Sequence, residues 1–209
     1  MDPLARGEEL ARSGRWDDAA VAFEEAIASG ARHVDAQTRR VLFRQARGDK
    51  TAYGDACRQL LRLFESSEPV PRVANIIAWA CALGPGAVSG YSEVVHLAEV
   101  AVASRSTSSR LNTLGAILYR AGRFEDAVRQ LGRSVEVHGA DGTPHDALFL
   151  AMAHHQLGHA DEARRWLRLG TAVDPIALRG GGNDTSWSSK LELEILRREA
   201  TSIIEPVHP

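Results

Sequence analysis

Apolar residues recur at helical spacing along most of the chain, with charged residues between them. Val94, Leu97, Ala98 and Ala101 follow this spacing and predict a helix over 93–103. A second stripe lies near the end of the chain, where Lys, Glu and Arg separate the apolar residues Trp187, Leu191, Leu193, Ile195, Leu196 and Ile203. This stripe predicts a terminal helix with one polar face. We therefore expect helices throughout and no strands.

A short pattern recurs three times in the sequence. Each copy starts with glycine, carries at least one basic residue and two acids, and ends with alanine; the copies are residues 14–19, 122–127 and 158–163. Gly122 and Gly158 are 36 residues apart, and Gly14 and Gly122 are 108 apart, which is three such units. A fixed period of this length indicates a repeat architecture.

The residue types in this pattern fit a turn between two antiparallel helices. The glycine suits the end of the first helix, because it can adopt a left-handed conformation there. The acidic pair suits the positive end of the next helix. Small residues flank the turn at positions 7, 115, 151, 26, 134 and 170, and larger apolar residues follow it at Phe23, Leu131 and Leu167. Helical hairpins of this kind bury their apolar faces by stacking.

This pattern resembles the tetratricopeptide repeat. The resemblance implies an all-α αα-superhelix, a solenoid of about five helical hairpins, over residues 1–177. The expected repeats cover about 1–33, 35–66, 71–104, 108–141 and 144–177. Residues 178–209 then form a glycine-rich loop and a C-terminal capping helix, which covers the last exposed apolar surface.

The second and third repeats depart from the pattern. Gly48 lies 34 residues after Gly14, as a turn glycine should, but Arg40 and Arg44 occupy positions where the family has apolar residues. The register of the first helix in repeat two is therefore left open. In repeat three, the glycine-rich segment 84–90 predicts a longer turn between its two helices.

The resemblance also implies a binding surface, because in this family the first helices of the repeats line a concave groove that often contacts an extended peptide. The matching positions here are Asn75, Trp79, Asn112, Tyr119, Arg120, Met152 and His155. Asn75 and Asn112 occupy equivalent positions in consecutive repeats, and a carboxamide can both donate to and accept from a peptide backbone. We expect either a ladder for main-chain recognition or, alternatively, two side chains that brace loops between repeats.

A possible basic patch lies in the second repeat. Arg40, Arg44 and Arg47, together with Arg39, recur at helical spacing. This stripe would receive a phosphate, RNA or an acidic peptide. A solvated face paired with nearby aspartates is the alternative.

Composition and charge exclude several function classes. The 209 residues carry a formal net charge of −2, which gives no overall positive field for nucleic acid or anionic lipid. The two cysteines, Cys57 and Cys81, are too few for a disulfide framework. His145, His154, His155 and His159 do not have the spacing of a metal site. The sequence contains no catalytic motif, signal peptide or membrane-length apolar run, so we expect a cytoplasmic, non-enzymatic protein with no cofactor and no metal.

These observations predict a protein-interaction scaffold whose partner is another protein or a peptide segment, with no nucleic acid and no membrane. Two alternatives remain. One is a regulatory or sensor subunit acting in trans on a kinase-like or protease-like enzyme, because related arrays occur in bacterial multidomain proteins. The other is a repeat protein that forms a homo-oligomer.

Overall fold

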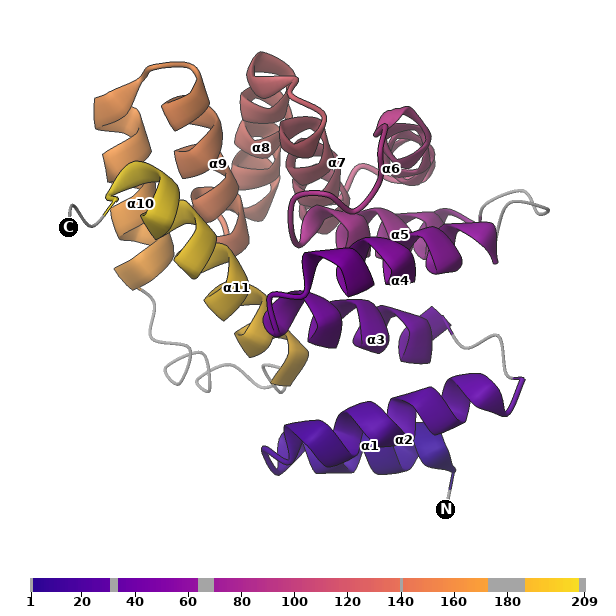
Figure 1. Ribbon diagram of the computed structural model, residues 1–209. Coiled ribbons are helices and arrows are strands. Elements are labelled where there is room, and N and C mark those ends of the chain that lie inside the picture. Colours follow the sequence, from indigo (N-terminus) through magenta and orange to yellow (C-terminus); the bar gives the residue numbers. More distant parts are fainter. Residues whose placement is uncertain (1, 31–33, 64–69, 140, 173–186, 207–209) are drawn as a thin grey trace.

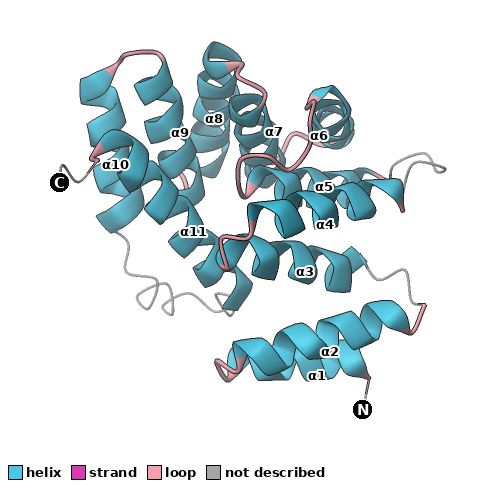
Figure 2. Ribbon diagram, in the orientation of Figure 1, coloured by secondary structure: helices cyan, strands magenta, loops and turns pink. Residues whose placement is uncertain are grey.

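The computed structural model describes residues 2–30, 34–63, 70–139, 141–172 and 187–206. Within these residues the chain forms eleven α-helices and no strand. Their bounds are α1 Pro3–Arg12, α2 Trp16–Ala28, α3 Val34–Ala46, α4 Lys50–Arg62, α5 Pro71–Ala82, α6 Ser92–Ser104, α7 Ser108–Arg120, α8 Phe124–His138, α9 Pro144–Gln156, α10 Ala160–Ala172 and α11 Trp187–Ile204. The expected all-helical fold is confirmed (Figure 2).

The first ten helices are arranged as consecutive antiparallel hairpins. Each odd-numbered helix packs against the helix that follows it, and neighbouring hairpins stack on one another in a curved array (Figure 1). The predicted turn glycines Gly14, Gly48, Gly122 and Gly158 have φ angles of 77°, 72°, 75° and 76°. This left-handed conformation ends the first helix of four of the five hairpins, as the sequence pattern predicts, whereas α5 ends at Ala82 with Leu83 in a right-handed conformation.

Close helix–helix contacts occur at the small-residue positions. A Cβ atom added to Gly115 on α7 would lie 2.5 Å from Cγ of Leu131 on α8. A Cβ atom added to Gly7 would lie 2.7 Å from the ring of Phe23, and one added to Gly170 would lie 2.8 Å from Leu148. These distances are shorter than any normal van der Waals contact, so only glycine allows the helices to approach this closely.

The structure fixes the register of the second repeat. Val41, Leu42 and Phe43 of α3 are buried, whereas Arg40 and Arg44 face α2 and form ion pairs with Glu24. The two arginines therefore lie at the interface between the first and second hairpins. Their position explains why this helix departs from the apolar pattern of the other repeats.

Helix α11 reaches beyond the last hairpin. It packs against α9 and α10, as a capping helix does, and also against α3 near the other end of the array. Figure 1 shows α11 crossing from beside α3 to beside α10. The glycine-rich segment predicted at 178–184 lies outside the described residues. Because α11 contacts the inner helices α3 and α9, it occupies part of the concave side.

Candidate functional site

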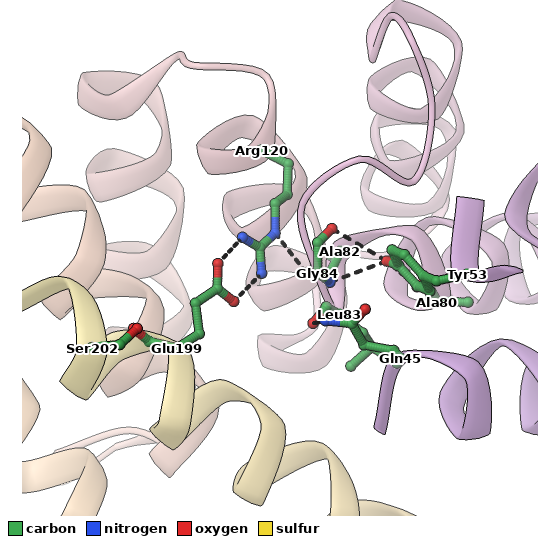
Figure 3. Close-up of polar contacts among 9 residues, drawn as sticks. All are labelled: Gln45, Tyr53, Ala80, Ala82, Leu83, Gly84, Arg120, Glu199 and Ser202. Atoms are coloured by element: carbon green, nitrogen blue, oxygen red, sulfur yellow. Dashed lines mark hydrogen bonds and ion pairs between the residues drawn. The ribbon is translucent and has the colours of Figure 1, made fainter. Parts of the chain in front are cut away.

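Arg120 fixes the C-terminal half of α11 to the concave side. Its Nη2 donates to Oε2 of Glu199 at 2.6 Å, and Nη1 donates to the other carboxylate oxygen. Its Nε donates to the carbonyl oxygen of Ala82 at 2.8 Å (Figure 3). The Arg120 side chain is only 3% exposed. Burial acts to lower the Arg120 pKa, but the bonds and charge of Glu199 outweigh it, so the pKa is raised and the guanidinium stays charged.

Arg120 is one of three side chains that bind the C-terminal end of α5. The Tyr53 hydroxyl donates to the Ala80 carbonyl at 3.1 Å and accepts from the Gly84 N–H at 3.0 Å. Gln45 donates to the Leu83 carbonyl at 3.4 Å (Figure 3). Carbonyls at a helix C-terminus lack partners within the helix, so these contacts satisfy buried acceptors. They hold α5 in position between α4 and α7.

Trp79 on α5 contacts the middle of α11. Its indole Nε1–H donates to Oε2 of Glu192 at 3.1 Å. The same ring meets His145 edge-on, with 5.4 Å between ring centroids, and Phe149 at 6.1 Å. Two residues predicted to bind a partner, Trp79 and Arg120, therefore bind the protein's own C-terminal helix.

The first turn of α11 lies against the N-terminal repeats. The centroid of the Trp187 ring lies 5.9 Å from that of Trp16, 6.2 Å from that of Phe23 and 5.7 Å from that of Phe43. Its indole N–H donates to Oε2 of Glu8 at 2.8 Å. The Glu8 carboxylate also accepts from Arg39, whose guanidinium lies 4.9 Å from the centroid of the Trp187 ring. Trp187 thus joins α1, α2 and α3 to the C-terminal helix.

Beside α11, the concave side contains a cavity of about 540 Å³. Its wall comes mainly from α3, α5, the N-terminal halves of α7 and α9, and α11. The lining residues used below are Asp35, Arg39, Asn75, Trp79, Ser109, Asn112, His145, Asp146 and Glu192. Both asparagines of the predicted ladder therefore line one cavity, which is large enough for a side chain or a small ligand.

Asn112 is already engaged within the protein. Its Nδ2 donates to Oδ1 of Asp146 at 2.7 Å, so it braces the fourth repeat against the fifth. The fully buried Asp146 carboxylate also accepts from the backbone N–H and hydroxyl of Thr143 at the start of α9. Asn75 differs, because its Oδ1 is buried and has no hydrogen-bond partner among the described residues. An unpaired buried acceptor costs free energy and is available to a ligand donor.

Burial shifts the pKa values of two cavity residues. It lowers the pKa of His145 to about 4, against the opposing attraction of Asp146. It raises the pKa of Glu192 to about 7, although the Trp79 hydrogen bond and the charge of Arg39 act to lower it. Nε2 of His145 lies 3.8 Å from Oε2 of Glu192. At neutral pH the imidazole is therefore uncharged and the carboxyl group is close to half-protonated.

The other predicted groove residues lie outside the cavity lining. Met152 is fully buried, and Tyr119 packs between Phe124 and Phe149. His155 is exposed near the end of α9. A role of these three residues in partner binding stays a prediction, and for Met152 and Tyr119 any such role would act through packing.

The predicted basic patch faces α2. Arg44 lies 3.2 Å from Glu24, Arg40 lies 3.8 Å from the same carboxylate, and Arg47 pairs with Asp17. Nε of Arg40 is buried without a hydrogen-bond partner in the described part of the chain. These arginines border a second cavity of about 530 Å³ between α2 and α3, with Phe23 and Phe43 in its wall. Their charges are mostly matched by acids of the first hairpin.

The described residues form no metal site and no membrane-spanning helix. Among residues 2–30, 34–63, 70–139, 141–172 and 187–206, no three His, Cys, Asp or Glu side chains gather as metal ligands would. None of the described helices has the length and apolarity needed to cross a bilayer. Cys57 and Cys81 are buried thiols, and the hydrogen bond of the Cys81 S–H to Cys57, together with burial, raises the pKa of Cys81 well above its usual value. A protonated, buried thiol is unreactive.

Sequence reasoning missed the acidic side chains that engage the groove. Glu192 and Glu199 are seven residues apart, so they lie on one face of α11, two turns from each other. That spacing on a helix with an apolar stripe was the available signal for a polar contact along its buried side. Asp146 gave no such signal, because its role depends on the packing of α7 against α9.

Comparisons with known proteins agree with the helical-repeat fold. Residues 107–140 and 147–168 match the tetratricopeptide repeat family. The fold is similar to the crystal structure of TTC0263, a thermophilic TPR protein of Thermus thermophilus, with a TM-score of 0.55, 16% identity and coverage of 95% of this chain and 96% of that one. It is also similar to PilW, a widely conserved type IV pilus biogenesis factor, with a TM-score of 0.59, 17% identity and coverage of 99% and 93%. No curated protein sequence matches the chain significantly.

Proposed function

This chain is a tetratricopeptide repeat protein, and we propose that it is a non-catalytic scaffold whose cavity beside α11 binds a partner polypeptide. The tetratricopeptide fold supports protein interaction in general. The observation that carries this proposal is the 540 Å³ cavity lined by Asn75, Trp79 and Asn112. Helix α11 occupies part of the concave side, so the partner segment enters where the groove beside it is left open.

The chemistry of the cavity wall suits a polypeptide. The unpaired Oδ1 of Asn75 accepts a backbone N–H, and the Trp79 ring offers apolar contact area. The wall comes from five helices held by buried contacts, so little scaffold entropy is lost on binding. Tyr119 and Arg120 contact Phe149, which packs against Trp79 in the wall. A role of Met152, His155 and the basic patch in binding stays a prediction.

A random peptide display selection against the full-length chain tests the proposal. Ser109 is exposed and lines the cavity, so Ser109→Trp places a large side chain in the opening. Ala103 is exposed on α6 and lies outside the cavity lining, so Ala103→Trp is the matched control. We expect selected peptides to bind the native chain and Ala103→Trp equally, and Ser109→Trp at least about tenfold more weakly, a loss near 1.4 kcal/mol. Equal binding to all three proteins would contradict the proposal.

The two alternative functions lead to different observations. A homo-oligomer sediments as a dimer or larger species at micromolar concentration, and Ser109→Trp leaves that state unchanged if the contact lies outside the groove. A regulatory subunit acting in trans uses the same cavity, and its effector would carry the selected peptide sequence. Sedimentation therefore tests the first alternative, and the display experiment informs the second.

A further inference from the structure

We propose that the cavity receives a basic side chain, lysine or arginine, of the bound polypeptide. This inference rests on the proposed function and adds the chemistry of the residue that enters. It is based on the charges of the cavity wall, on the way its buried carboxylates are satisfied, and on the aromatic ring beside them.

Acidic groups in the wall lack cationic partners. Asp35 and Asp146 form no ion pair in the described part of the chain, and Glu192 lies 3.8 Å from His145, whose imidazole is uncharged at neutral pH. Arg39 also lines the cavity, but its guanidinium is bonded to the Glu8 carboxylate at 2.9 Å. Among the described residues, the lining therefore holds three acids, Asp35, Asp146 and Glu192, but one permanent cation, Arg39, which Glu8 already engages.

The buried carboxylate of Asp146 is the clearest case of an acid in the wall without a cationic partner. It is fully buried and accepts hydrogen bonds from Asn112 and Thr143, which are both neutral donors. These bonds satisfy its lone pairs, but no Lys or Arg side chain pairs with it in the described part of the chain. A cation that enters the cavity is attracted more strongly by a buried carboxylate than by an exposed one.

Trp79 adds a second attraction for a cation. Its ring lines the same cavity, and its N–H bond to Glu192 holds the acid next to the ring. A cation over an aromatic face is attracted by the ring electrons, more strongly when it is desolvated. The protein already makes this contact elsewhere, between Arg39 and Trp187. An extended basic side chain can thus place its alkyl part along Trp79 and its charge near the carboxylates.

The protonation of Glu192 links binding to proton release. Glu192 faces Trp79 on α5, His145 on α9 and Arg39 on α3. Burial raises its pKa to about 7, so a proton is present on part of the molecules at neutral pH. A cation bound beside it stabilises the ionised form and lowers this pKa. Binding near pH 7 should therefore release protons, and this release disappears in Glu192→Gln.

The test uses the full-length chain and the peptide Ac-Gly-Gly-Arg-Gly-Gly-NH₂. Its control is the same peptide with citrulline, which is neutral and of nearly the same shape. The indole N–H resonance of Trp79, assigned by its loss in Trp79→Phe, reports binding in a nitrogen–proton correlation spectrum. One side chain in a pocket typically binds with a Kd of about 1–10 mM. We expect a saturable shift with arginine or the matching lysine peptide, and at least about tenfold weaker binding with citrulline.

Two protein variants complete the test. Glu192→Gln should weaken the arginine peptide and abolish the proton release measured by calorimetry in buffers of different ionisation enthalpy. Glu194→Gln, on the exposed side of α11, should leave both unchanged. Equal shifts by the arginine and citrulline peptides, preference for an acidic peptide, or no shift by either basic peptide would overturn the inference.

Failure of this inference is distinguishable from failure of the proposed function. If display-selected peptides lose affinity in Ser109→Trp but contain no required Lys or Arg, the cavity binds a polypeptide and the basic-residue assignment is wrong. If Ser109→Trp changes nothing, the proposed function itself is wrong.

Discussion

Arg120 on α7 and Glu199 on α11 form a bidentate ion pair in the interior of the concave side, although 79 residues separate them in sequence. The same guanidinium binds the carbonyl end of α5 through Ala82. One side chain therefore connects three helices. A buried guanidinium needs all of these acceptors, because unpaired donors at such a site are costly.

Removing one partner of this pair should destabilise the protein strongly. Glu199→Gln leaves a buried guanidinium without its counter-charge, and such changes typically cost about 3–5 kcal/mol. Urea unfolding followed by circular dichroism measures this loss. Exchanging both groups for apolar residues, in Arg120→Met with Glu199→Leu, should recover much of the stability. A single variant with native stability would show that the pair is not formed.

Trp187→Ala should loosen the N-terminal repeats as well as α11. The change removes a buried aromatic ring and typically costs about 3–5 kcal/mol. Because Trp187 contacts Trp16, Phe23 and Phe43, amide hydrogen exchange should accelerate in α1, α2 and α3. Trp166, half-buried on α10, is a matched site, and Trp166→Ala should leave exchange in α1–α3 unchanged.

The stability of Glu192→Gln relative to the native chain should depend on pH. The raised pKa, about 7 in the folded state against 4.5 for an ordinary Glu, means that the folded state binds more protons between these values. Native stability from this group is therefore lost as pH rises from 4.5 to 7. Gln carries no charge, so the free energy of unfolding of the variant, relative to that of the native chain, should increase over that range by an amount on the order of 3 kcal/mol.

His145 acts in the opposite direction over almost the same range. Its pKa of about 4 against 6.5 means that the unfolded state binds more protons between these values, so stability rises with pH there. In the native chain the Glu192 and His145 contributions oppose each other between pH 4.5 and 6.5, so stability should rise more steeply with pH in Glu192→Gln than in the native chain. Urea unfolding at pH 5, 6, 7 and 8 measures both profiles, and parallel profiles would contradict these pKa shifts.

Two glycines allow a matched test of helix packing. Gly115→Ala places a methyl group against Leu131 and should cost about 1–3 kcal/mol. Gly132→Ala on the neighbouring helix α8 meets no atom within 4 Å and should stabilise by about 0.5–1 kcal/mol, because alanine favours the helix. Thermal unfolding of both variants measures the difference. Equal effects would mean that α7 and α8 are further apart than described.

The repeat pattern predicted the local structure well, and the reason is physical. Gly122 and Gly158 end helices, and Gly115 and Leu131 meet across one hairpin, so these requirements act within about 35 residues and leave a visible period. The apolar stripe after residue 186 likewise predicted α11 as a helix. Structure that depends on residues close in sequence could thus be predicted.

The surface against which α11 packs could not be predicted, because it depends on contacts between residues far apart in sequence. The Trp79–Glu192 hydrogen bond joins residues 113 positions apart, and the Trp187–Glu8 bond joins residues 179 apart. A single stripe of apolar residues predicts that a helix is covered on one face but not which surface covers it. The buried state of Arg120 and the cavity beside Glu192 both result from that placement.

The contact between Trp187 and the first hairpin also bears on how the chain folds. Repeat arrays with only neighbour-to-neighbour contacts can unfold unit by unit, and they fold quickly because their contacts are short in sequence. Here the last described helix, α11, contacts the first, α1. The repeats between them must therefore fold and bring the two helices together before either end of the chain is fully stable. We expect a single cooperative unfolding transition and slower folding than in an open array of equal length.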